Sequence, residues 1–184
     1  PELTDQQYCE KHHTRMTIGL IDVDGHNFPN LALMKLAAYH KQQGDTVEWY
    51  QQDRHYDLVY QSKVFDETYT PDIAFIPQAD TVIKGGTGYG LENKLPDDIE
   101  HIMPDYGLYN ITDTAYGFLT RGCPRHCPFC VVGDKEGLRS QKVADLTEFW
   151  SGQKNIELLD PNLLACPERM ELLDQLSESG ARVN

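Results

Sequence analysis

The first ninety residues contain short apolar runs separated by one long amphipathic stretch. Residues 17–23 are mostly apolar, which is typical of a strand buried in a parallel sheet. Pro29 follows a short turn and can begin a helix with a broad apolar side, and Gly44 can end that helix in the left-handed conformation. Residues 46–50 again favour a strand, so the chain is predicted to open with a βαβ unit.

Three more apolar segments complete this first part of the pattern. Each is predicted to be a strand, and they occupy residues 57–60, 73–76 and 81–84. The last of them continues into a glycine-rich turn at residues 85–88. Residues 91–114 are rich in Pro, Asp and Tyr and have no clear period, which indicates an extended connection between two domains. Residues 1–15 are polar and unpatterned, and we interpret them as a tail.

The remaining residues alternate between strand and helix patterns. Residues 115–120 form an apolar strand that leads into a cysteine-rich loop, and residues 145–151 favour a short helix. Residues 155–160 form the next strand, and residues 167–179 form an amphipathic helix that Gly180 can end. A strand, loop, helix, strand and helix in this order are typical of the opening of a parallel β/α barrel.

The pattern therefore predicts an α/β protein with two units. A Rossmann-like or flavodoxin-like domain is expected over residues 16–90, and the first part of a parallel β/α barrel, a partial TIM barrel, over residues 115–184. The chain begins at Pro1 rather than at Met, and it stops where another strand is about to begin. We interpret it as a fragment of a longer protein, with Met16 as a candidate start.

The charge balance argues against some classes of function. The 184 residues include 16 Lys and Arg against 29 Asp and Glu, which gives a formal net charge of −13 at pH 7. The sequence has no Lys/Arg stripe, which argues against non-specific nucleic-acid binding. No run approaches the roughly 18 apolar residues of a membrane span and no signal peptide opens the chain, so we expect no membrane association and a cytoplasmic location.

Three of the five cysteines fall within eight residues, at Cys123, Cys127 and Cys130. The odd number of cysteines and the lack of a signal peptide argue against an extracellular disulfide framework. Closely spaced thiolates in a reducing compartment most often share a metal ion or a cluster. Three protein ligands with one open position are typical of a reactive centre, by the rule known for zinc.

The spacing of these cysteines leaves two non-catalytic kinds of site open. A structural zinc site would need a fourth ligand, which Cys9, Cys166 or a histidine such as His126 could supply. A ferredoxin-like electron-transfer cluster would take Cys166 as its fourth thiolate. Both alternatives predict a module that binds a metal without carrying out chemistry on a substrate.

The longer string around the cysteines resembles a known family. Residues 118–130 read Phe-Leu-Thr-Arg-Gly-Cys-Pro-Arg-His-Cys-Pro-Phe-Cys, with the spacing Cys-x3-Cys-x2-Cys and an aromatic residue before the last cysteine. This string resembles the signature of radical S-adenosylmethionine (radical SAM) enzymes, and in particular of members that carry an N-terminal cobalamin-binding-like domain. The resemblance covers the motif, its strand and the order of the two domains, and so nearly the whole chain.

The resemblance implies an enzyme. In the family, three thiolates hold a 4Fe–4S cluster whose fourth iron binds S-adenosylmethionine, and one electron breaks a carbon–sulfur bond to give a 5′-deoxyadenosyl radical. Cys123, Cys127 and Cys130 would be the cluster ligands, and Phe129 would lie near the adenine. The electron would come from a reductant such as flavodoxin or ferredoxin. The substrate and the type of reaction stay open, and we expect the fragment alone to be inactive.

Two polar residues beyond the second predicted barrel strand are further candidates. In the family, residues at that edge bind the amino group of S-adenosylmethionine, often through a Gly-Gly-Glu sequence that is absent here. Asp160 and Asn162 take that place by position. An Asp-Pro-Asn turn that ends the strand is the alternative interpretation.

The N-terminal unit resembles cobalamin-binding domains in its order of elements and in a few residues. The family's first loop can contain Asp-x-His-x-x-Gly, and this chain supplies Asp24 and His26, with Pro29 in place of the glycine. The resemblance implies that His26 ligates cobalt and that Gly85 and Gly86 lie at the cofactor's tail. A loop histidine bonded to backbone or water, and a tight turn at a strand end, are the alternatives.

Overall fold

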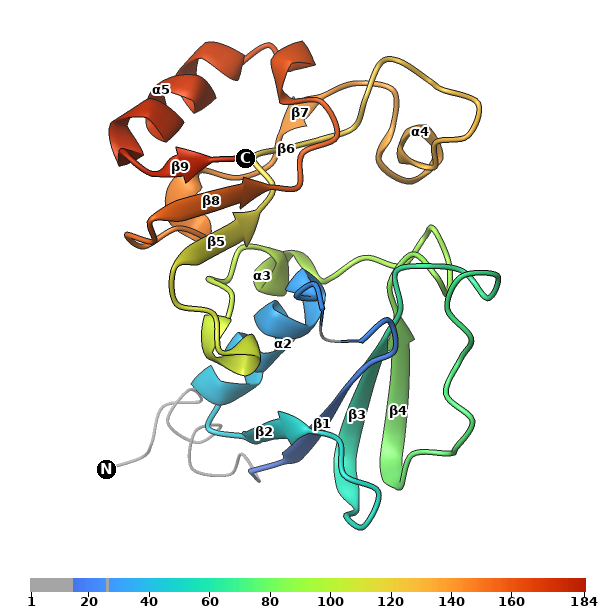
Figure 1. Ribbon diagram of the computed structural model, residues 1–184. Helices are drawn as coiled ribbons and strands as arrows, with labels where there is room; N and C mark the ends of the chain where they lie inside the picture. The colour runs from blue at the N-terminus through green and yellow to red at the C-terminus, as the bar shows by residue number, and fades with distance from the viewer. Residues whose placement is uncertain (1–14, 26) are drawn as a thin grey trace, which may run out of the picture.

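The computed structural model describes residues 15–25 and 27–184, which fold into two α/β units that lie one above the other in Figure 1. The lower unit contains β1 (Thr17–Asp22), α2 (Leu31–Gln42), β2 (Thr46–Trp49), β3 (Tyr56–Ser62) and β4 (Ala79–Gly85). The connection contains α3 (Asp97–Glu100) and η1 (Tyr106–Tyr109). The upper unit contains β5 (Thr114–Gly117), β6 (Thr120–Arg121), α4 (Val132–Glu136), β7 (Gln141–Lys142), η2 (Leu146–Glu148), β8 (Asn155–Leu158), η3 (Leu163–Ala165), α5 (Arg169–Ser179) and β9 (Arg182–Val183).

The lower sheet is entirely parallel and has the strand order β2-β1-β3-β4. Gly19 in β1 lies level with Glu48 in β2 and with Val59 in β3. The chain therefore places β2 on one side of β1 and then crosses to β3 on the other side, as in Rossmann-like folds. The predicted α/β class and the opening βαβ unit are confirmed.

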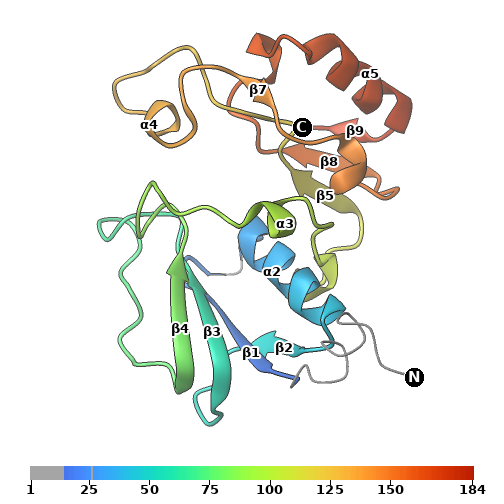
Figure 2. The same ribbon diagram turned by 180° about the vertical axis from the view of Figure 1, so that it is seen from behind.

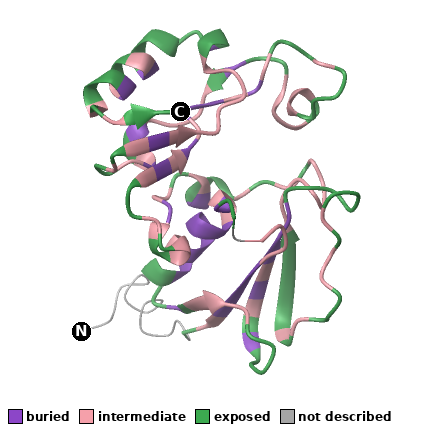
Figure 3. Ribbon diagram, viewed as in Figure 1, coloured by how far each residue is buried: buried purple, intermediate pink, exposed green. Residues whose placement is uncertain are grey.

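Helix α2 forms where the sequence predicts it because both of its ends are capped. The Asn30 side chain accepts a hydrogen bond from Leu33 N at 3.2 Å, which satisfies a free N–H of the first turn. Gly44 follows the last turn with φ of +86°, the left-handed conformation that favours glycine. The helix has buried residues along its length (Figure 3), among which Leu33 and Ala37 pack with Ile18 of β1, whereas Lys35 reaches Glu100 of α3.

The opposite face of the lower sheet is covered without a helix. Between β3 and β4 the chain runs as an irregular segment, which Figures 1 and 2 show from both sides. The strand predicted at residues 73–76 is therefore wrong. Its apolar residues serve to cover the sheet, because Ile73 packs against the buried Ile21 cluster and the Phe75 ring stacks on Tyr50 with centroids 5.7 Å apart. Pro71 and Pro77 flank the segment, and proline disfavours regular strand pairing.

The upper unit contains a parallel sheet in chain order, β5-β8-β9, and the small antiparallel pair β6-β7. Three parallel strands in chain order are present, and the described residues do not close into a barrel. Helix α5 ends at Gly180 in the left-handed conformation, as predicted. The predicted strand over residues 115–120 is divided, because the chain leaves β5 after Gly117 and pairs again only from Thr120. Only the 3₁₀ turn η2 forms within the predicted helix at residues 145–151.

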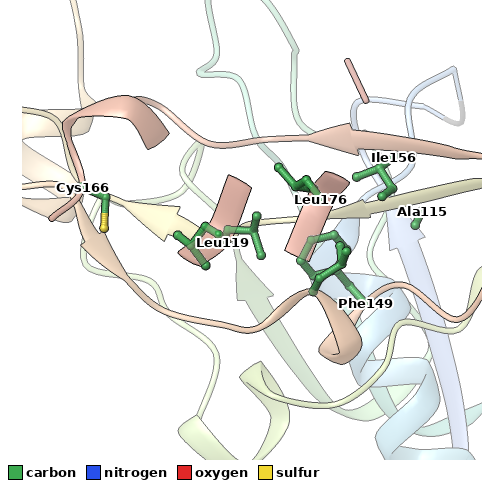
Figure 4. Close-up of a cluster of buried hydrophobic side chains, with 8 residues drawn as sticks. Ala115, Leu119, Phe149, Ile156, Cys166 and Leu176 are labelled. Carbon is green, nitrogen blue, oxygen red and sulfur yellow. The ribbon is translucent and has the colours of Figure 1, made fainter. Parts of the chain in front are cut away.

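The core of the upper unit lies between this sheet and helix α5 (Figure 4). Its buried side chains come from β5, β8, α5 and the segments between them: Ala115, Leu119, Leu146, Phe149, Ile156, Cys166, Leu172 and Leu176. Gly117 borders this core, and a Cβ atom at that position would lie 2.3 Å from the Phe149 ring. The ring therefore needs a residue without a side chain at the end of β5. Among the described residues, no helix is both long enough and apolar enough to cross a membrane.

The contact between Gly117 and Phe149 gives a first prediction. We expect Gly117→Ala to lower the free energy of unfolding by about 1–3 kcal/mol, because the added methyl group forces the Phe149 ring out of its position. Gly85→Ala is the matched control, because nothing lies within 4 Å of its added Cβ atom and neither glycine has a positive φ. Urea unfolding followed by circular dichroism measures both variants. Equal stability of the two variants would contradict the prediction.

Candidate functional site

The cluster of cysteines lies on a long loop whose two ends are paired with each other. We call residues 122–140 the cysteine loop; it connects β6 to β7, and these strands pair Arg121 with Gln141 and Thr120 with Lys142. In Figure 1 the loop projects from the side of the upper unit and includes α4. Because it follows β5, it starts at the carboxyl end of a parallel strand, where β/α barrels place their active sites.

Close backbone packing fixes the start of the cysteine loop. Gly122 has φ of +84°, and a Cβ atom there would lie 2.0 Å from Arg139 O, so only glycine fits. Gly122 N donates to Glu136 Oε2 at 3.1 Å, and Cys123 N donates to Gly137 O at 3.1 Å. The backbone of Cys123 is therefore held by the returning half of the loop.

The three cysteines of the loop are free thiols that solvent can reach. Cys123 and Cys127 are half-buried and Cys130 is exposed. Cys130 N donates to Cys127 O at 3.0 Å, which makes a tight turn between these two residues. Hydrogen bonds from the Arg125 backbone and from the Asn162 side chain lower the pKa of the Cys123 thiol below its usual value. The thiolate is the form that binds metals, so the surroundings of Cys123 favour ligation.

The thiols are not gathered around one point in this conformation. Within residues 15–25 and 27–184, no set of three or more His, Cys, Asp or Glu side chains is placed to hold a metal ion. The donor set nevertheless fits an iron–sulfur cluster chemically, because three thiols stand on one short segment. Ligands of a metal must converge on it, so binding requires the cysteine loop to close, and closure and binding are then one coupled step.

Cys166 lies away from solvent and takes no part in the loop. Its side chain is buried in the core of the upper unit and donates to Glu168 Oε2 at 3.1 Å. Burial raises the pKa of the Cys166 thiol, which disfavours the thiolate. A role as fourth ligand would require this core position to open. Cys9, the other candidate named for a fourth ligand, lies outside the described residues.

Asp160 holds the carboxyl ends of β5 and β8 together. Its carboxylate accepts hydrogen bonds from Leu119 N at 2.9 Å, from Thr120 N at 2.6 Å and from the Thr120 hydroxyl at 2.5 Å. Burial raises the pKa of Asp160, and these hydrogen bonds offset part of that effect. In this conformation the Asp160 carboxylate is bonded to the residues that follow β5, and its binding to S-adenosylmethionine stays a prediction.

Asn162 and Phe129, the other residues predicted to bind S-adenosylmethionine, lie in different surroundings. The Asn162 side chain contacts the cysteine loop, with Nδ2 3.6 Å from Cys123 Sγ, and its carbonyl accepts from Ser140 Oγ at 2.8 Å. Phe129 is 91% exposed, so the described residues do not enclose its ring. Of Asp160 and Asn162, which are distant in sequence from the cysteine loop, Asn162 is the one whose side chain contacts a predicted cluster ligand.

A chain of charged groups joins the cysteine loop to the lower unit, and no motif in the sequence indicates it. Arg121 Nη1 lies 2.7 Å from Glu136 Oε1, and its Nη2 lies 3.1 Å from Glu100 Oε1. Glu100 Oε1 also lies 3.2 Å from Lys35 Nζ of helix α2. The Arg121 guanidinium packs over the Phe118 ring at 3.9 Å. These partners are distant in sequence, so no local spacing could reveal them.

Two cavities border this region. One of about 20 Å³, room for about one water molecule, lies between the units and is lined by Lys35, Glu100 and Glu148 among others. An open cavity of about 380 Å³ lies at the base of the cysteine loop, lined by Glu136, Gly137, Leu138, Arg139 and Gln141.

The polar groups at the switch point of the lower sheet are already bonded within the chain. In sheets of this order, ligands bind at the carboxyl ends of the two strands where the order reverses, here β1 and β3. Tyr109 of the connection donates to Asp22 Oδ2 at 2.6 Å, and Asn30 Nδ2 donates to Ser62 Oγ at 2.9 Å. Burial and the Asp22 carboxylate raise the pKa of Tyr109, so its hydroxyl stays protonated as the donor.

Of the residues predicted for cobalamin, the structure describes Gly85 and Gly86. Gly86 has φ of +94°, and a Cβ atom there would lie 2.3 Å from Lys63 O. The backbone of Lys63 therefore occupies the space beside Gly86. Gly85 has open space around it, and the Asp24 carboxylate accepts from Val64 N at 2.5 Å. His26 lies outside the described residues. The tight-turn interpretation accounts for Gly86, and cobalamin binding stays a prediction.

No family model matches this chain, and no curated protein or solved structure matches it either.

The hydrogen bond between Asn162 and Cys123 gives a second prediction. We expect Asn162→Ala to raise the pKa of Cys123, because it removes a donor that stabilises the thiolate. Between about pH 7 and 9, less Cys123 is then ionised, and its alkylation by iodoacetamide slows by about two- to threefold. Peptide-resolved mass spectrometry after timed alkylation measures the rate. Asn184→Ala is the control, and an unchanged rate in Asn162→Ala would refute the assignment.

Proposed function

We propose that this chain is part of a radical SAM enzyme in which Cys123, Cys127 and Cys130 hold a 4Fe–4S cluster. The observation that carries the proposal is the separation of the cysteines: three free, accessible thiols share one loop, whereas Cys166 is buried in the core and bonded to Glu168. A three-thiolate donor set leaves one iron of the cluster open for a ligand that is not protein. A four-thiolate site would instead need Cys166.

The position of the cysteine loop supports the same function. The parallel order β5-β8-β9 suits the first strands of a β/α barrel, and the loop starts at their carboxyl ends. Gly122 and Glu136 hold the start of the loop, while Asn162 keeps Cys123 toward its thiolate form. These residues hold Cys123 in place before a cluster binds, so that closure of the loop needs to move only Cys127 and Cys130 toward it.

The cluster and S-adenosylmethionine would supply one chemical step. When bound and reduced, a 4Fe–4S cluster supplies the electron that breaks a carbon–sulfur bond in S-adenosylmethionine. The chain's own contribution is to bind and orient. Arg139 and Gln141 line the 380 Å³ cavity at the base of the loop, and an arginine there suits the carboxylate of a small anionic ligand. The exposed Cys130 and Phe129 leave the loop open to an electron donor of the flavodoxin or ferredoxin type.

Reconstitution with iron and sulfide under anaerobic conditions tests this function. We expect the reduced protein to give a 4Fe–4S electron paramagnetic resonance signal that changes when S-adenosylmethionine is added. Cys123→Ala, Cys127→Ala and Cys130→Ala should each lose the cluster, because two thiolates cannot hold three irons. Cys166→Ala is the matched control and should keep the full iron content.

Other outcomes would overturn the proposal. Loss of the cluster in Cys166→Ala would indicate a four-thiolate electron-transfer site. A protein that takes up zinc and assembles no cluster would indicate a structural site, with His126 as the candidate fourth ligand on the same loop.

A further inference from the structure

Strand β4 forms an exposed edge of the lower sheet. It pairs with β3, and in the described part of the chain it has no second neighbour. Residues 80–84 are all exposed, which Figure 3 shows as a mostly green strand. An exposed edge carries unpaired backbone N–H and C=O groups, so it is a template on which another strand can pair.

The direction of the backbone groups along β4 follows from its pairing with β3. Gly85 O accepts a hydrogen bond from Lys63 N at 3.1 Å, so Gly85 directs its backbone groups toward β3. Backbone groups alternate sides along a strand, so Val82 and Lys84 direct theirs toward the open edge. The alternation is interrupted at the start of β4, because Gln78 O accepts a hydrogen bond from Tyr56 N at 3.0 Å and the register with β3 skips Asp80. The side chains of Asp80 and Lys84 are 68% and 49% exposed, and their carboxylate and ammonium groups can therefore reach a strand added at this edge.

The residues at the open edge are complementary to themselves. If two copies of β4 pair antiparallel about an axis at Val82, then Val82 faces Val82, and Asp80 faces Lys84 twice. Opposite charges directly across a pair of strands stabilise it, whereas like charges destabilise it. Centring the pair on Asp80 or on Lys84 would place that residue against its own copy. Among the pairings centred on Asp80, Val82 and Lys84, the charges therefore favour the one centred on Val82.

The segments that flank β4 add apolar contacts to such a pair. Antiparallel pairing sets the start of one β4 beside the end of the other. Ile76, which is 91% exposed, precedes β4, and position 76 of one copy falls opposite Gly88 of the other when the pair is centred on Val82. The Ile76 side chain of each copy would then pack beyond the end of the other copy's β4. These contacts enlarge an interface that a single short strand would leave below the roughly 1,200 Å² of a stable complex.

We propose that two copies of this chain associate through β4, paired antiparallel about Val82, so that their lower sheets become one continuous sheet. Lys84 Nζ already lies 2.8 Å from Asp72 Oδ2 of its own copy, so it would bridge that carboxylate and Asp80 of the second copy. A pair about a twofold axis uses the same edge on both copies and closes the assembly at two. The association is independent of the iron–sulfur proposal.

Charge exchange at the edge tests the pairing. Sedimentation equilibrium of the whole chain is expected to show a monomer–dimer equilibrium. Asp80→Lys and Lys84→Asp each place like charges opposite each other twice, and each should weaken association about tenfold. The double variant Asp80→Lys with Lys84→Asp restores opposite charges and should restore most of the affinity. Glu178→Lys, on the exposed side of α5, is the charge-matched control for Asp80→Lys and should associate normally.

Val82→Pro is a second variant that acts on the backbone alone. The N–H group it removes faces the open edge, so the β3-β4 ladder is kept and the circular dichroism spectrum should not change. The variant should be monomeric. A wild-type chain that stays monomeric up to about 100 µM, a dimer that the charge exchanges do not weaken, or assembly beyond two copies would each overturn the proposal.

Discussion

The position of the cysteine loop depends on the short turn that follows β8. Asp160 accepts three hydrogen bonds from Leu119 and Thr120, exactly where the chain leaves β5 and stops pairing with the sheet. A buried N–H left without a partner costs about 1–3 kcal/mol, so the departure of the loop is held at one point. The carbonyl of Asn162 holds the returning end through Ser140. One turn therefore fixes both ends of the loop, and its amide contacts Cys123 between them.

The parts of the fold that could be predicted are those governed by local signals. Helix α2 and its neighbouring strands follow from an apolar period, a capping residue and Gly44. The strand predicted at residues 73–76 is wrong because an apolar run indicates that side chains pack against the protein, but it does not show whether the backbone joins a sheet. Ile73 is half-buried by packing on a sheet face, and the exposed Phe75 ring stacks on Tyr50, and neither contact needs strand pairing. The division of the strand after Gly117 likewise depends on Asp160, which is distant in sequence.

The candidate site likewise contains some features that the sequence predicts and others that it does not. The spacing of Cys123, Cys127 and Cys130 is local, so the sequence could locate the loop, and the chemistry of the loop stays a proposal. The same sequence could place Asp160 at the correct edge, but the direction of its carboxylate depends on the end of β5. The contact between Arg121 and Glu100 links the upper unit to the connection between the units, and no local sequence pattern predicts it. The sequence therefore does not predict a side-chain contact when the two residues belong to different secondary-structure elements.

The hydrogen bond from Tyr109 to Asp22 has a consequence for any ligand of the lower sheet. Tyr109 belongs to the connection between the units, and its hydroxyl holds a carboxylate at the point where sheets of this order bind ligands. The connection thus acts as an internal competitor at that point. The apparent dissociation constant of a ligand there is its intrinsic value divided by the fraction of molecules in which the tyrosine has left, so a fraction of about 1% would weaken binding about a hundredfold. The affinity of a ligand for the lower sheet would then depend on how firmly the upper unit and its connection are held against the lower unit.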